Sequence, residues 1–263
     1  MKKSTALAGL AALSLLDISA ATPVVAQDVN SFIGPYAGAH FGYFSGDATF
    51  QSAPYTVTSP ALGNSFTFPG RNDPFDFAGG LVGAHGGINF LLGTNIIGGF
   101  EGGLSNLDEQ DSVFASGTIL SLVTNDGFSF TRRSVLDFDW QGTIRGRLGF
   151  VNGSTLFFAT GGVAFLNLDW SETTFLQRSS GFGPSSALSH SDSETLVGGA
   201  VGGGFETAIT PTIFFGADYL YENFGSWNSV PHGFINVQSG KIDDIDIHKV
   251  RVRITVKLGG PAP

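Results

Sequence analysis

The sequence predicts an all-β protein: an eight-stranded antiparallel up-and-down transmembrane β-barrel with three short periplasmic turns and four long extracellular loops. Three observations favour this fold class. The chain begins like an exported protein, and no apolar run after residue 26 reaches the length of a transmembrane helix. Short and long connections also alternate between the candidate strands, as in bacterial outer-membrane barrels.

The N-terminus has the layout of a secretory signal peptide. Lys2-Lys3 precedes an apolar run over residues 5–16, and small residues then lead to Ala26 and Gln27. This apolar run is too short to span a membrane, so we predict cleavage between Ala26 and Gln27. The predicted organisation is a signal peptide (1–26), a short N-terminal segment (27–34), the barrel (35–258) and a short C-terminal tail (259–263).

The composition suits a membrane barrel better than a soluble domain. The chain of 263 residues has 38 Gly and 25 Phe, and only 13% of its residues are charged, about half the usual share. Its net charge of −9 becomes −10 when two lysines and one aspartate leave with residues 1–26. The chain therefore has no basic surplus to bind nucleic acid, and without cysteines it has no disulfides.

Alternation of apolar and polar residues predicts eight strands, over residues 35–44, 75–90, 95–105, 137–151, 154–168, 194–209, 212–225 and 247–258. Three connections are tight, "LLGTN", "VNGS" and "ITPT", and Asn152-Gly153 is a strong hairpin turn sequence. The other four, 45–74, 106–136, 169–193 and 226–246, are long and polar. In a meander, alternate connections lie at the same end, so one end is predicted to carry the short turns and the other the long loops.

Each predicted strand has a face without charge, and the last strand shows the pattern best. Lys249, Arg251 and Arg253 alternate with aliphatic residues up to Leu258. A charged side chain facing lipid would cost roughly 2–4 kcal/mol, so the charges are predicted to face the lumen. The predicted interior charge network is Glu101, Asp139, Arg145, Arg147, Glu206, Asp218, Lys249, Arg251 and Arg253. Its role is either a structural ion-pair network or a charged pathway for small solutes.

Outward-facing aromatic residues are predicted near both ends of the strands, as in interfacial girdles. They are Trp140, Tyr219 and Tyr221 at the loop end, and Phe90, Phe150 and Phe157 at the short-turn end.

No catalytic, cofactor or metal site is predicted, and we expect the protein not to be an enzyme. His190-Ser191-Asp192 lies in a polar connection, where consecutive residues rarely face one another. His40 and His85 lie on neighbouring predicted strands, where hydrogen bonding inside the barrel competes with a metal or haem role. The acidic clusters 108–111 and 243–246 lack the Ca²⁺-loop pattern.

Several segments resemble a known family. "GPYAGAHFGY", "WQGTIRGRLGF", "FFATGGVAF", "GADYLYENFG" and "KVRVRITVKL" are similar, in order and spacing, to small outer-membrane β-barrel proteins of alphaproteobacteria, the outer-membrane immunogenic or opacity-like porin family. The resemblance covers nearly the whole mature chain. It implies a barrel in the bacterial outer membrane, surface-exposed loops and no catalytic site. It also places Glu101, Arg145, Arg147, Glu206 and Asp218 at the family's inward charged positions.

The expected function is that of a surface protein that supports envelope integrity and contacts the surroundings or a host through its loops. One alternative is a narrow porin-like channel, although eight strands leave little room for water. A second alternative is a haem- or metal-binding outer-membrane protein. The expected partners are outer-membrane lipids, lipopolysaccharide, the barrel-assembly machinery and an external ligand at the loops.

Overall fold

The computed structural model describes residues 29–59, 63–123, 127–178, 185–229 and 240–259. The predicted signal peptide and its cleavage site at Ala26 and Gln27 lie outside these residues. The described chain begins with a short 3-10 helix, Val29–Phe32, which leads into the first strand.

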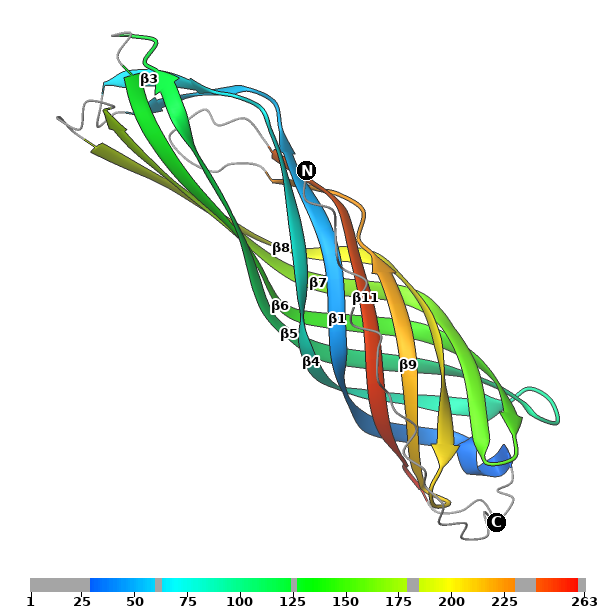
Figure 1. Ribbon diagram of the computed structural model, residues 1–263. Helices are drawn as coiled ribbons and strands as arrows, with labels where there is room; N and C mark the ends of the chain where they lie inside the picture. The colour runs from blue at the N-terminus through cyan, green and yellow to red at the C-terminus, as the bar shows by residue number, and fades with distance from the viewer. Residues whose placement is uncertain (1–28, 60–62, 124–126, 179–184, 230–239, 260–263) are drawn as a thin grey trace, which may run out of the picture.

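Eight strands form a closed antiparallel ring, which confirms the predicted fold class. Each strand pairs with the next, and the first pairs with the last to close the ring (Figure 1). The ring strands are β1 (Gly34–Ser52), β4 (Arg71–Leu91), β5 (Ile96–Leu120), β6 (Gly127–Asn152), β7 (Thr155–Arg178), β8 (Ser185–Ala208), β9 (Ile213–Asn223) and β11 (Gly240–Lys257). Three short strands add to them, namely β2 (Tyr55–Ser59), β3 (Asn64–Phe68) and β10 (Trp227–Ser229).

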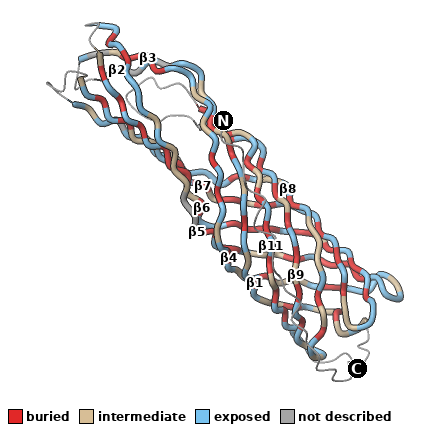
Figure 2. Tube along the Cα trace, viewed as in Figure 1, coloured by how far each residue is buried: buried red, intermediate tan, exposed pale blue. Residues whose placement is uncertain are grey.

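Side chains alternate between the inside and the outside of the ring, which Figure 2 shows as alternating buried and exposed positions. In β11, Lys249, Arg251 and Arg253 are buried, whereas Val250 and Ile254 are about half exposed. This follows from the two-residue period of a strand. The cationic face of the last strand therefore points into the barrel.

The three tight connections lie at one end of the ring. They join β4 to β5, β6 to β7 and β8 to β9. Gly153 in the second turn has φ of +61°, a left-handed backbone conformation that explains the Asn-Gly sequence there.

The four long connections lie at the other end, but most of their described residues are strand and not loop. Pairing of β4 with β5 ends at Val82 and Asn106, and pairing of β8 with β9 ends at Gly199 and Asn223. Beyond these points the ring divides into two sheets (Figure 1). The four-stranded extension consists of residues 107–120, 127–138, 168–178 and 185–198 of β5 to β8. The three-stranded extension consists of residues 47–52, 71–81 and 240–246 of β1, β4 and β11, with β10 alongside.

The prediction of long loops at 45–74, 106–136, 169–193 and 226–246 was therefore wrong in its secondary structure, since most of their described residues are strand. The period of two continues beyond the ring. In β7, Leu168 and Trp170 are buried whereas Asp169 and Ser171 are exposed. Ser, Asp and Asn occupy the outer positions here, and their low strand propensity hides the alternation.

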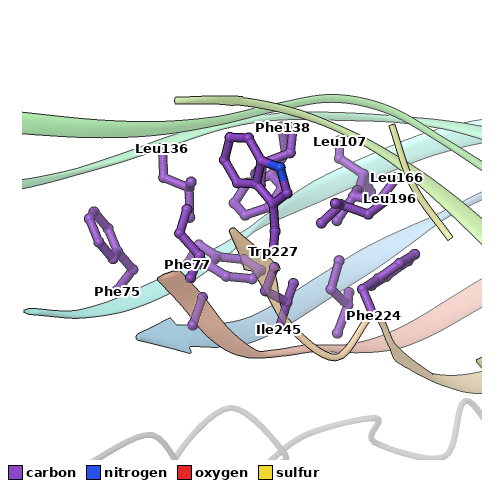
Figure 3. Packing of buried hydrophobic residues seen from close by; sticks show 14 of the residues in the cluster. Phe75, Phe77, Leu107, Leu136, Phe138, Leu166, Leu196, Phe224, Trp227 and Ile245 are labelled. Atoms are coloured by element: carbon purple, nitrogen blue, oxygen red, sulfur yellow. The ribbon is translucent and has the colours of Figure 1, made fainter. Parts of the chain in front are cut away.

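Three apolar clusters fill the inside of the molecule. The inner apolar cluster, near the short turns, is Phe32, Ile97, Val151, Leu156, Phe158, Ala208 and Phe214. The outer apolar cluster begins where the ring divides and includes Phe50, Phe75, Phe77, Leu107, Leu136, Phe138, Leu166, Trp170, Leu196, Phe224, Trp227 and Ile245 (Figure 3). The tip cluster is Phe66, Phe68, Ile119, Phe128, Phe130 and Leu176.

Candidate functional site: a charged belt in the lumen

A belt of buried charged residues lies between the inner and outer apolar clusters. Along β5, Ile97 belongs to the inner cluster, Glu101 to the belt and Leu107 to the outer cluster. The same order holds along β6, where Arg145 and Arg147 lie between the two clusters. The lumen is therefore layered, apolar at both ends and ionic in the middle.

Glu101 is the centre of the belt. Its Oε1 accepts a hydrogen bond from Arg145 Nη2 at 2.5 Å, and its Oε2 accepts one from Arg253 Nη2 at 2.5 Å. Arg147 Nη1 lies 3.7 Å from Oε2, and the Tyr36 hydroxyl donates to the same oxygen at 3.0 Å. One carboxylate thus joins side chains from β1, β6 and β11.

Two further carboxylates complete the centre of the belt. Arg251 binds Asp218 in bidentate fashion, with Nε at 2.9 Å from Oδ1 and Nη2 at 2.5 Å from Oδ2. Arg253 Nη1 also donates to Asp218 Oδ2, at 3.0 Å. Glu206 accepts from Arg147 Nη2 at 2.5 Å. Since Arg253 bonds both Glu101 and Asp218, the belt is one connected network.

Lys249 forms the part of the belt nearest the outer apolar cluster, and it has a partner that the predicted network lacked. Its Nζ donates to Glu222 Oε2 at 2.8 Å, and Gln141 Nε2 donates to Glu222 Oε1 at 2.8 Å. Glu222 is fully buried. Its two-residue steps from Asp218 already placed it on the charged face of its strand, so the sequence held the information. Tyr36 was also missed, because the predicted network contained only charged residues.

One predicted member of the network, Asp139, is not in the lumen. The residue is exposed, and the pairing of β6 with β7 shifts register between Phe138 and Gln141. Such an irregularity changes the face on which the following residues lie. Counting alternate residues back from Arg145 therefore placed Asp139 on the wrong side. The structure brings the other eight predicted residues together inside the ring.

The belt leaves little freedom for chemistry or transport. Glu101, Arg145 and Arg253 each expose only 1% of their surface, and each is held by partners on other strands. Buried charges are tolerated only when paired and hydrogen-bonded. The arrangement is that of an ion-paired plug, with five cations and four carboxylates held between two apolar layers.

The histidines considered as ligands or catalysts are placed as follows. His40 and His85 are buried beside the belt. His190 packs edge-on against Trp170, with ring centres 5.5 Å apart. Ser191 of β8 pairs with Ser171 of β7. His248 is exposed and hydrogen-bonded to Tyr219, whereas His232 lies outside the described residues. Within the described chain, no group of three or more His, Cys, Asp or Glu residues could hold a metal ion.

His40 and His85 belong to a chain of hydrogen bonds across the lumen. The Thr255 hydroxyl donates to Glu206 at 2.9 Å, since a carboxylate can only accept. His85 Nε2, 2.9 Å from the Thr255 oxygen, must then carry the proton that this oxygen accepts. For two neutral rings, His85 Nδ1 accepts from His40 Nδ1 at 3.3 Å, and His40 Nε2 accepts from Ser105 at 2.9 Å.

These hydrogen bonds predict opposite tautomers for the imidazole rings of His40 and His85. We expect ¹⁵N NMR of the imidazoles to show His40 protonated at Nδ1 and His85 at Nε2. The Thr255→Val variant removes the acceptor of the buried His85 Nε2–H group, so His85 should no longer be restricted to one tautomer. The free energy of unfolding should fall by about 1–3 kcal/mol. The reverse pair of tautomers in the parent protein would contradict the assigned direction.

Beyond the ring, three aspartates lie side by side on the outside of the three-stranded extension. Asp47 pairs directly with Asp76 on one side and Asp246 on the other. Partial burial, and then the charges of Asp246 and Asp76, raise the pKa of Asp47. A raised pKa favours the protonated form in the folded state, so this group stabilises the fold at low pH. Its contribution is lost as the pH rises through the folded-state pKa.

The Asp47→Asn variant should therefore be more stable than the parent protein at neutral pH. Removing one of three neighbouring like charges relieves their repulsion. The gain should disappear in acid, where Asp47 of the parent protein is itself protonated. Urea unfolding in lipid vesicles at several pH values measures it, and a gain that is equal at every pH would show that charge is not the cause.

Five of the six aromatic residues predicted for the girdles are exposed, and Tyr221 is half-buried. Trp140 and Tyr219 are exposed near the point where the ring divides, and Phe90, Phe150 and Phe157 are exposed near the short turns. No helix in the described part of the chain is long and apolar enough to cross a membrane.

Comparisons with known proteins agree with this architecture. The family model described as outer membrane protein beta-barrel domain matches residues 8–255. Comparison with curated proteins finds no match. Among solved structures, the chain is similar to the outer membrane protein OprG from Pseudomonas aeruginosa, at 10% identity and a TM-score of 0.41 over 88% of this chain and 100% of that one.

Two further similar structures are surface proteins. The attachment invasion locus protein Ail of Yersinia pestis matches at 11% identity and a TM-score of 0.30, over 85% of this chain and 98% of that one. Neisserial surface protein A matches at 12% identity and a TM-score of 0.31, over 84% and 99%. The family match covers nearly the whole chain. This chain thus belongs to the outer-membrane-protein β-barrel domain family, and its barrel lies in the bacterial outer membrane.

Proposed function

We propose that the protein is a closed, non-catalytic barrel that holds an extracellular β-platform for binding a macromolecule outside the cell. The observation that carries this proposal is the presence of the four-stranded and three-stranded extensions, which together form the platform. Four ring strands continue for about a dozen residues past the last β4–β5 pair, and their inner sides pack into the outer apolar and tip clusters. Ordered structure of this size outside the membrane has no role in closing the barrel.

The two extensions are fastened to each other by aromatic and ionic contacts. Phe77 of β4 packs on Phe138 of β6 with ring centres 4.3 Å apart, and Phe50 of β1 stacks on Trp170 of β7 at 5.4 Å. Arg71 forms an ion pair with Glu172 across the same gap. The platform is therefore a packed unit, which reduces the entropy that binding must overcome.

The platform offers an open strand edge. Within the described residues, 187–198 of β8 pair only with β7. An unpaired edge presents a row of free backbone donors and acceptors to an extended segment of a partner. This edge is also polar, with serines, His190, Asp192 and Glu194 along it, which favours reversible binding over aggregation.

Adhesion tests this role. Cells that display the protein should adhere to cultured cells or immobilised matrix proteins better than cells with an empty vector. Ser191→Pro and Asp192→Pro remove backbone donors that point to opposite edges of β8. One of the two should keep the fold and lose adhesion, because it blocks only the free edge. Equal adhesion by both variants and the parent would count against the platform.

Conductance tests the closed lumen and the porin alternative. The purified protein, inserted in a planar bilayer, should show no reproducible single-channel openings, because the belt and both apolar clusters fill the barrel. An Arg145→Ala/Arg251→Ala variant measured in parallel removes two belt side chains. Openings of the parent protein that change in this variant would show that the lumen is a pathway and would favour the porin-like channel over the closed barrel.

Three narrower points are part of the same proposal. We propose that the protein is of the alphaproteobacterial outer-membrane immunogenic type that its strand motifs resemble. Barrel-assembly machinery, lipopolysaccharide and a host or other external ligand are its proposed partners. The haem or metal alternative is less favoured, because His40 and His85 already have hydrogen-bond partners and lie among arginines.

A further inference from the structure

The outside of the ring carries an apolar groove of about 510 Å³ across β4, β5 and β6. Its floor is formed mainly by Gly86 and Gly102, which lie directly opposite each other on β4 and β5. Leu104, Trp140 and Ile144 stand beside this floor as walls. The two walls Leu104 and Ile144 are each 63% exposed, so they project well beyond the glycines. The volume is in the range of ligand-binding sites.

The floor of this groove is open, whereas side chains cover one end of a similar hollow nearer the short turns. A Cβ added to Gly102 would have only the Thr143 backbone oxygen near it, at 3.8 Å. A Cβ added to Gly98, in the second hollow, would lie 2.7 Å from Leu92 and 3.0 Å from Phe90. Leu92 and Phe90 therefore cover the second hollow at Gly98, whereas its other end, at Gly146 and Gly161, is as open as Gly102.

The groove lies in the half of the ring that faces the extracellular side. Trp140 pairs with Asn106, which is the last β5 residue to pair with β4 before the ring divides. Tryptophan prefers the boundary between lipid and water. From Trp140 the groove runs inward over Gly102, so it lies at the depth of the outer leaflet.

We propose that the groove binds one acyl chain of an outer-leaflet lipid. The outside of the ring lies in hydrocarbon, so an apolar molecule must cover the exposed backbone of the floor. An acyl chain is narrow and flexible enough to lie between Leu104 and Ile144. The rigid wall of a second barrel would meet those projecting side chains before it reached the glycines. This lipid site is separate from the extracellular platform.

Trp140 makes the site measurable. It forms a wall of the groove and is 40% exposed, whereas Trp170 and Trp227 are 6% and 8% exposed inside the outer apolar cluster. The mature protein, folded in detergent micelles, is titrated with a phospholipid brominated in its acyl chains, and quenching of tryptophan fluorescence is recorded. We expect quenching that saturates near one lipid per protein.

Gly102→Leu places a side chain in the groove without a close contact and should weaken the apparent affinity at least about tenfold. That factor corresponds to losing the burial of about two methylene groups. Gly199→Leu is the matched control. A Cβ at Gly199 also meets nothing within 4 Å, and the residue lies on β8, outside the groove. Its titration should match the parent's.

Heat-dependent migration in SDS gels checks that each variant is folded. If Gly102→Leu does not fold, Leu104→Ala removes a wall instead and should also weaken binding. Quenching that grows in proportion to lipid without saturation, or that is equal in the parent and both groove variants, overturns the proposal. So does a dimer of the parent that Gly102→Leu dissociates, because a second copy would then occupy the groove.

Discussion

Glu101→Gln should lower the free energy of unfolding by at least about 3–5 kcal/mol, the usual cost of removing one partner from a buried ion pair. The change keeps the size of the side chain and removes only its charge. It leaves Arg145 and Arg253, both 2.5 Å from this carboxylate, without their principal counter-charge. It also brings Arg147 and the Tyr36 hydroxyl next to a neutral amide. Urea unfolding in lipid vesicles, followed by tryptophan fluorescence, measures the loss.

The control is a carboxylate that the sequence pattern placed in the same belt. Asp139→Asn should change stability by less than about 0.5 kcal/mol, because the residue is exposed. A Glu101→Gln/Arg145→Gln double variant should recover part of the loss, since it removes one of the uncompensated charges. Equal effects of Glu101→Gln and Asp139→Asn would mean that the belt does not stabilise the barrel.

These two carboxylates also show how far the sequence could predict the site. Glu101 was placed correctly because β5 keeps an unbroken period of two from Ile97 to Leu104. Asp139 was misplaced because a register shift at Phe138 interrupts that period in β6. Local alternation determines which way a side chain points only while the strand is regular. A bulge depends on how the neighbouring strand continues, and that strand is distant in sequence.

The fold shows a similar limit. The ring, its strand order and its tight turns followed from alternation and from Asn152-Gly153. The extensions did not, because their outer positions carry serine, aspartate and asparagine, which are typical of loops. The inner positions provided the missing information. Leu166, Leu168 and Trp170 keep the same spacing through the point where the ring ends. Apolar residues at alternate positions therefore predict a strand even where the residues between them are polar.

Trp170→Ala should loosen the two extensions and leave the ring intact. The indole stacks on Phe50 of the opposite extension with an angle of 8° between the rings. The Arg71 guanidinium carbon lies 4.5 Å from the centre of the same Phe50 ring. Loss of a buried tryptophan costs about 3–5 kcal/mol. Because the residue belongs to the outer apolar cluster and stacks across the two extensions, this cost should fall on the extensions and not on the belt.

Hydrogen exchange of the whole protein in micelles separates the two parts of the molecule. In Trp170→Ala, amides of residues 168–178 and 185–198 should exchange much faster, whereas amides beside Glu101 should keep their protection. Phe175→Ala, on the same strand but 58% exposed, is the matched control and should leave both regions unchanged. Adhesion should fall with Trp170→Ala and not with Phe175→Ala, because an ordered platform is what the binding edge of β8 requires. Faster exchange throughout the ring would instead show that the barrel and its extensions unfold as one cooperative unit, which would contradict this prediction.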